Sequence, residues 1–205
     1  MAEMKKDLVV GVLALQGGFS KHLDMLRSLG VKAIEVRRPE ELALCDGLVL
    51  PGGESTVIMK QLDFSQLRQP LTLFSKNKPL FGTCAGLIVI SQEILQSPLQ
   101  SPMVPFGLLD VSVERNAFGR QIESFAAAIE VSSEISSKRS VSAIFIRAPR
   151  IKRCGVDVQV LAAYEGEPVL VQQGFHLGAT FHPELTVDNS IHAYYLELVK
   201  RQRKN

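Results

Sequence analysis

The segment Gly82-Thr83-Cys84-Ala85-Gly86 places a cysteine between two glycines, where a short apolar run gives way to a helical pattern. This order is typical of a nucleophile elbow, a tight turn that lifts a reactive side chain to the top of a sheet. A position at a helix N-terminus also favours the thiolate form of a cysteine. The alternative is a buried, unreactive thiol. The flanking glycines favour a nucleophile at Cys84.

A cysteine nucleophile needs a base, and the base needs a group that orients it. His182 is the best candidate because it begins His182-Pro183-Glu184 directly after an apolar run. Pro183 predicts a rigid strand end, and in an extended chain His182 and Glu184 project to the same side. The carboxylate would then hold the imidazole in the required tautomer. The alternative is a chance His-Pro turn at the surface.

The other three histidines suggest less chemistry. His22 lies in the first amphipathic segment, where we expect it at the surface, and His192 lies in the last helical pattern. His176 falls in a predicted turn after Gly174 and Phe175. The sequence assigns no function to these three rings.

A second glycine-containing motif, Pro51-Gly52-Gly53-Glu54-Ser55-Thr56, follows another apolar run. Its two glycines let backbone amides approach a ligand closely. The amide of Gly53, together with that of Ala85, is therefore a candidate oxyanion hole for a tetrahedral intermediate. A phosphate-binding loop is a weaker alternative because no Lys-Ser/Thr pair follows the glycines. A plain strand-to-helix turn is the other alternative.

The elements that must position these motifs alternate through the first half of the chain. Strands separated by helices predict right-handed crossovers and a parallel sheet. The expected strands are Leu8–Leu15, Val31–Val36, Gly47–Leu50 and Pro79–Gly82. The expected helices are Phe19–Leu29, Ser55–Leu62, Ser65–Lys76 and Leu87–Leu95.

The second half is rich in strands after a proline-rich loop at Gln96–Gly107. The expected strands are Leu108–Val113, Ser124–Val131, Ala143–Ile146, Val158–Tyr164, Pro168–Gln173 and Leu177–Thr180, followed by a helix that Asp188 caps. We expect these strands to extend the same sheet. The sequence thus predicts an α/β fold over residues 1–205, a single-domain three-layer sandwich with a mostly parallel central sheet and flanking helices.

Composition excludes several classes of protein. The 205 residues are 46% hydrophobic and 21% charged, as in a globular chain, and the net charge of +2 gives no support for a nucleic-acid or membrane-surface partner. Three cysteines without a CxxC pair predict neither a disulfide framework nor a zinc site. No apolar run reaches the roughly 18 residues of a membrane span. We expect a cytoplasmic protein.

The motifs GTCAG, PGGEST and FHPEL together resemble those of class I (triad) glutamine amidotransferases. The segments Leu13–Gly17, Glu114–Gln121, Phe145–Pro149 and His182–Thr186 narrow the resemblance to the glutaminase subunits of pyridoxal 5′-phosphate synthase. The similarity runs from about residue 8 to residue 200, and the stretch 96–106 departs most from the family pattern. It implies a flavodoxin-like fold.

The resemblance implies hydrolysis of L-glutamine to L-glutamate and ammonia, with Cys84 as nucleophile, His182 as acid and base, and Glu184 as its orienting group. It places glutamine at Gly53, Glu54, Ser55, Arg115, Ile146 and Arg147. On the sequence alone Arg115 and Arg147 are ordinary surface charges, although a guanidinium suits the α-carboxylate of glutamine.

The same resemblance implies a reaction without a metal or organic cofactor and a separate synthase barrel subunit that receives the ammonia and activates the glutaminase. Two other functions remain open. One is a triad amidotransferase subunit that serves another synthase, such as imidazole glycerol phosphate synthase. The other is a non-catalytic, chaperone-like protein on a similar cysteine-elbow scaffold, which does not require the pair His182 and Glu184.

Overall fold

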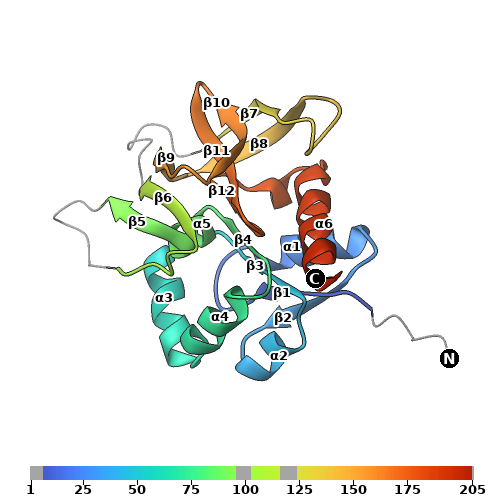
Figure 1. Cartoon of the computed structure of the whole chain (residues 1–205), viewed down its shortest axis with the longest axis vertical. Coiled ribbons are helices and arrows are strands. Elements are labelled where there is room, and N and C mark those ends of the chain that lie inside the picture. The colour runs from blue at the N-terminus through green and yellow to red at the C-terminus, as the bar shows by residue number, and fades with distance from the viewer. Residues whose placement is uncertain (1–6, 96–102, 116–123, 205) are drawn as a thin grey trace.

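The computed structural model describes residues 7–95, 103–115 and 124–204 (Figure 1). Residues 96–102 of the predicted loop and residues 116–121 of the motif Glu114–Gln121 lie outside the described residues.

Helices and strands alternate along the first half of the chain, as predicted. The elements are β1 (Val9–Leu13), α1 (Phe19–Ser28), β2 (Lys32–Val36), α2 (Pro39–Ala43), β3 (Gly47–Leu50), α3 (Ser55–Phe64), α4 (Arg68–Ser75), β4 (Leu80–Thr83) and α5 (Ala85–Ile90). The second half contains β5 (Ser91–Leu95), β6 (Leu109–Glu114), β7 (Ser124–Val131), β8 (Ser140–Ile146), β9 (Arg150–Cys154), β10 (Gln159–Tyr164), β11 (Glu167–Gln173), β12 (His176–Ala179), a 3₁₀ turn η1 (Pro183–Leu185) and α6 (Ser190–Lys204).

The described strands form one nine-stranded sheet in the order β2-β1-β3-β4-β12-β11-β10-β7-β8. Pairing is parallel from β2 to β12 and antiparallel from β12 to β8. This arrangement confirms the predicted α/β class. The parallel half carries the helical crossovers, and β12 joins it to the antiparallel half.

Apolar side chains fill both faces of this sheet. On one face, α1 and α6 pack against the strands through side chains such as Leu26 and Tyr195. On the other face, α3, α4 and α5 pack through side chains such as Leu62 and Leu71. Figure 1 shows the two groups of helices on opposite sides of the parallel strands. Every residue of β1 is buried, as expected of a strand that is covered on both faces.

Strand β6, predicted as Leu108–Val113 to extend the main sheet, lies outside it, contrary to the prediction. β5, β6 and β9 form a separate three-stranded sheet that packs on the same face as α3 and α5. The helix predicted over Leu87–Leu95 is wrong beyond Ile90: Ser91 is extended, its hydroxyl donates to Ile88 O at 2.9 Å, and the following residues pair with β6. Strand β9 and the short helix α2 were not expected.

The predicted cap of the last helix is present. Asp188 Oδ1 accepts a hydrogen bond from the backbone N–H of Ser190 at 2.8 Å. This bond satisfies one of the amide donors that a helix leaves free at its N-terminus.

Candidate active site

The turn between β4 and α5 holds Cys84 in an unusual backbone conformation. Its φ is +49° and its ψ is −106°, a region that residues other than glycine rarely adopt. The turn is so tight that a Cβ on Gly82 would lie 2.6 Å from the carbonyl group of Gly86. The backbone N–H of Cys84 donates to Ala179 O at 2.8 Å. These features are those of the predicted elbow.

Parallel pairing of β4 with β12 brings the second motif to the same place. Gly82 pairs with Gly178 and Thr83 with Ala179, so the chain that leaves β12 passes beside Cys84. The backbone N–H of His182 donates to Ile144 O at 2.8 Å and ties this segment to β8. Carboxyl ends of neighbouring parallel strands meet at one sheet edge, which is where α/β proteins place their sites.

His182 and Glu184 contact each other as the sequence predicts, but through a different backbone. His182 Nδ1 lies 2.8 Å from Glu184 Oε1. The expected rigid strand end is wrong, because β12 stops at Ala179 and Pro183 starts the 3₁₀ turn η1. Proline suits the first position of such a turn, since its missing N–H has no partner there. The turn brings the two side chains together.

His182 and Glu184 each favour the charged form of the other, and Cys84 favours the charged form of His182. Burial lowers the pKa of His182, but hydrogen bonds and negative charge from Cys84 and Glu184 outweigh it and raise the pKa to about 10. Burial raises the pKa of Glu184, but His22 and His182 outweigh it and leave the pKa below its ordinary value. An imidazolium and a carboxylate are therefore the forms expected at neutral pH.

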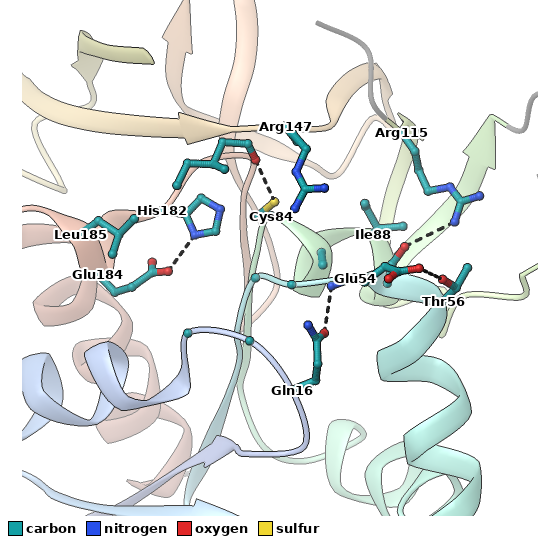
Figure 2. Close-up of a pocket in the computed structure, with 17 residues that line it drawn as sticks. Gln16, Glu54, Thr56, Cys84, Ile88, Arg115, Arg147, His182, Glu184 and Leu185 are labelled. Carbon is teal, nitrogen blue, oxygen red and sulfur yellow. Dashed lines mark hydrogen bonds and ion pairs between the residues drawn. The ribbon is translucent and has the colours of Figure 1, made fainter. Parts of the chain in front are cut away.

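A cavity of about 710 Å³ opens above Cys84, and Figure 2 shows the side chains that line it. All nine predicted site residues besides Cys84 line this cavity, and they are Gly53, Glu54, Ser55, Ala85, Arg115, Ile146, Arg147, His182 and Glu184. The structure thus brings together residues from five separate segments of the chain.

The two arginines reach the cavity from different strands. Arg115 Nη1 donates to Ser55 Oγ at 3.4 Å. Arg147 follows β8 with a φ of +43°, and the carbonyl of the preceding Ile146 accepts from Cys84 Sγ at 3.8 Å. Figure 2 shows the guanidinium group of Arg147 beside Cys84, whereas that of Arg115 lies farther off, past Ile88 and toward Thr56. The cavity therefore carries positive charge close to the thiol.

Gln16 and Gly52 also line the cavity, and the sequence analysis gave neither a role. Gln16 Oε1 accepts from the backbone N–H of Glu54 at 2.9 Å and so holds the glycine loop. Gly52 lies against His182 and Cys84, which leaves no room for a Cβ. A signal for Gln16 was present, because it belongs to the segment Leu13–Gly17 on which the family resemblance rests.

Two histidine predictions were wrong. His22 is fully buried rather than at the surface, because it lies beside Leu23 on the face of α1 that packs on the sheet. His176 is the first residue of β12 and not part of a turn. Its Nδ1 accepts from the backbone N–H of Leu80 at 3.2 Å, and burial lowers its pKa to about 4. The ring of His176 therefore ties β12 to β4.

A family model described as the SNO glutamine amidotransferase family matches residues 12–201. The chain belongs to this family. The resemblance to glutamine amidotransferases that the sequence motifs indicated is thus confirmed, and it covers almost the whole described chain. The motifs that contribute the cavity lining all fall within the matched residues.

Individual relatives of this glutamine amidotransferase agree. The pyridoxal 5′-phosphate synthase subunit PdxT of Thermosipho africanus is 46% identical over 193 residues, which cover 94% of this chain and 99% of that protein. The PdxT subunit of Thermotoga maritima is 44% identical, with 93% and 99% covered. A crystal structure of a glutamine amidotransferase has a TM-score of 0.84 at 45% identity and covers 93% of this chain and 98% of that one.

More distant structures share the fold alone. The structure of PurLQS from Thermotoga maritima has a TM-score of 0.63 at 16% identity, with 93% of this chain and 98% of that chain covered. Over the described residues of this glutamine amidotransferase, no three His, Cys, Asp or Glu side chains are grouped as a metal site requires. Among its described helices, none has the length and apolarity that crossing a membrane takes.

Proposed function

We propose that this chain is the glutaminase subunit of a pyridoxal 5′-phosphate synthase, acts as one domain, and hydrolyses L-glutamine to L-glutamate and ammonia. The observation that carries the proposal is the contact of a carboxylate with a histidine beside a cysteine at a strained elbow, inside a cavity with two arginines. Relatives that match over almost their full length and are named as PdxT subunits support the specific assignment.

The first half of the reaction forms a thioester. The Cys84 thiolate attacks the side-chain amide carbon of glutamine, and the amide oxygen gains the negative charge. Backbone N–H groups of Gly53 and Ala85 stabilise that oxyanion. When the C–N bond breaks, the imidazolium of His182 gives its proton to the departing nitrogen and ammonia leaves. The raised pKa of His182 keeps this proton available at neutral pH.

The second half releases glutamate. Neutral His182 takes a proton from water, whose oxygen attacks the γ-glutamyl thioester. The C–S bond then breaks and returns the thiolate of Cys84, while His182 is again an imidazolium. Glu184 accepts from His182 Nδ1 throughout, and so keeps Nε2 as the atom that exchanges the proton.

Substrate binding uses the polar rim of the cavity. A guanidinium of Arg115 or Arg147 pairs with the α-carboxylate of glutamine, since a planar fork of donors matches a carboxylate. Glu54 and Ser55, together with the backbone at Ile146, bind the remaining polar atoms of the substrate. The ammonia passes to a separate synthase barrel subunit in a hetero-oligomer. We place the protein in the cytoplasm, where Cys84 stays reduced.

The test is a glutaminase assay with and without the cognate synthase subunit. We expect slow hydrolysis by the chain alone, a sharp rise when the synthase is added, and no turnover by Cys84→Ala in either condition. Turnover that persists in Cys84→Ala would overturn the mechanism. Stimulation by imidazole glycerol phosphate synthase instead would assign the chain to a different synthase.

A further inference from the structure

A row of buried imidazole groups lies next to the carboxylate of Glu184. His22 on α1 and His192 on α6 are both fully buried, and His22 Nδ1 lies 2.9 Å from His192 Nε2. The other ring nitrogen of His22, Nε2, lies 3.3 Å from Glu184 Oε2 and 3.2 Å from Thr83 Oγ1. The row therefore connects two helices to the residue before Cys84 and to the partner of His182.

The neighbours of His22 determine where its proton lies. A carboxylate oxygen only accepts hydrogen bonds, so a proton on Nε2 of His22 is favoured over a lone pair facing Glu184. Nδ1 of His22 is then an acceptor, and Nε2 of His192 donates to it. Burial lowers the pKa of both rings, so each is neutral at neutral pH. The donors therefore all face the same way: His192 donates to His22, and His22 donates toward Glu184.

Filling this layer of the core with two imidazole rings costs folding free energy. Both rings pack edge-on or tilted against Phe81, with centroids 6.5 Å and 5.7 Å away, inside the core between the helices and the sheet. Buried polar groups cost free energy unless they are hydrogen-bonded, and His192 Nδ1 has no hydrogen-bond partner among the described residues. Leucines would fill the layer without that cost. We therefore look for the role of the two histidines at the other end of the row, where His22 lies beside Glu184.

That end is the second oxygen of Glu184. Oε1 accepts from His182, and the side chain of Glu184 is 1% exposed. Oε2 makes no hydrogen bond of regular geometry within the described residues, and the polar group 3.3 Å away is Nε2 of His22. Without that group, Glu184 would be a buried carboxylate with one unsatisfied oxygen. Rotating or taking up a proton would then lower its free energy. Either change stops it from orienting His182.

We propose that His22, held by His192, is a positioning residue for glutamine hydrolysis: its Nε2–H fixes the carboxylate of Glu184, which in turn orients His182 toward Cys84. The inference rests on the proposed function, because it needs Glu184 to act in a triad. His22 does not line the cavity, so it acts through Glu184 and does not touch the substrate.

The experiment compares His22→Gln with His22→Asn, two amides that differ only in reach. The glutamine amide nitrogen extends to the position of Nε2 and can donate to Glu184, whereas the asparagine amide extends only to the position of Nδ1, beside His192. We expect His22→Gln to keep kcat within about threefold of wild type and His22→Asn to lower it at least tenfold, with KM unchanged. The assay uses the chain with its cognate synthase.

A second readout is the pH profile of kcat/KM. In His22→Asn the alkaline limb moves to lower pH, because a misplaced Glu184 no longer supports the charge of His182 and that ring loses its proton sooner. In His22→Gln the limb stays where it is in the wild type. Thermal unfolding of both variants provides the stability control, since a merely structural role lowers kcat and Tm in parallel.

The outcomes separate the two proposals. A wild-type chain without glutaminase activity, alone or with the synthase, overturns the proposed function. An active wild type whose two His22 variants have equal kcat and equal pH profiles overturns the positioning role and leaves the proposed function standing. A loss of kcat that follows Tm in both variants also overturns it.

Discussion

Gly52 and His182 are packed so closely that no side chain fits between them. A Cβ on Gly52 would overlap His182 Cε1 and lie 3.1 Å from Nδ1 and 3.3 Å from the Cβ of Cys84. The glycine loop after β3 therefore limits how the ring of His182 can lie beside Cys84.

Gly52→Ala tests this packing. The added methyl group displaces the imidazole from Cys84, and displacements of about 1 Å in an active site cost about 100-fold in rate. We expect kcat to fall by about that factor with Tm little changed, measured by glutaminase assay and thermal unfolding. An alanine variant with wild-type kcat would show that the ring of His182 is free to move.

Glu184→Gln tests the orienting role of the carboxylate. The amide has nearly the shape of the carboxylate but gives up its charge and one acceptor, so His182 is no longer held in one tautomer. By analogy with other triads, we expect kcat to fall by about 10²–10⁴-fold. Binding of glutamine, measured by calorimetry on the variant, should be unaffected. A loss of glutamine binding as large as the loss of turnover in this variant would contradict the orienting role of Glu184.

The charge of His182 predicts how stability depends on pH above neutrality. Its pKa is about 10 in the folded chain, against an ordinary value of 6.5. A raised pKa contributes stability that is fully present below pH 6.5 and is lost as pH rises through about 10. In Cys84→Ala the pKa of His182 falls, so the loss of stability is smaller and is complete at a lower pH. Urea unfolding between pH 6 and pH 10 measures both, and NMR of the labelled imidazole gives the pKa directly.

Three buried histidines predict the opposite behaviour in acid. Burial lowers the pKa of His22, His176 and His192, so the unfolded chain binds more protons below pH 6.5 than the folded chain does. Below pH 6.5 the free energy of unfolding should then fall on acidification, by up to about 1.4 kcal/mol per pH unit for each histidine that stays neutral in the folded chain. Urea titrations at pH 7 and pH 5 measure this slope.

His176→Asn is the matched variant for that slope. The amide oxygen can still accept from the backbone N–H of Leu80, but the side chain does not titrate. The change in the free energy of unfolding per pH unit should therefore fall from the value for three histidines to the value for two. A slope that is unchanged in the variant would mean that His176 titrates alike in the folded and unfolded chains.

The turns that carry the proposed catalytic residues were predicted well from the sequence, because glycines and short apolar runs mark them. The strand predicted at Gly47–Leu50 agrees with β3, and the cysteine falls between β4 and α5 as expected. Strand β9 was missed because only Ile151 of its five residues is buried, which leaves no alternating pattern to detect. Helix α2 has only five residues and is too short for a helical period.

Residues whose role depends on tertiary contacts could not be predicted. His22 was expected at the surface because it lies in an amphipathic segment, whereas its environment comes from α6 and η1, far along the chain. The same holds for β5, whose spacing fits a helix and which becomes a strand by pairing with β6. Local pattern carries no information about these partners.

The pairing of β4 with β12 has a consequence for how the chain acquires its structure. Cys84 follows β4 and His182 follows β12, two strands that are neighbours in the sheet although the two residues are 98 positions apart in the sequence. Closing such a long loop is entropically slow compared with forming the local crossovers of β1 to β4. During refolding, helical and strand content should therefore return before Cys84 meets His182, and the recovery of the proposed glutaminase turnover should mark the final assembly of the sheet.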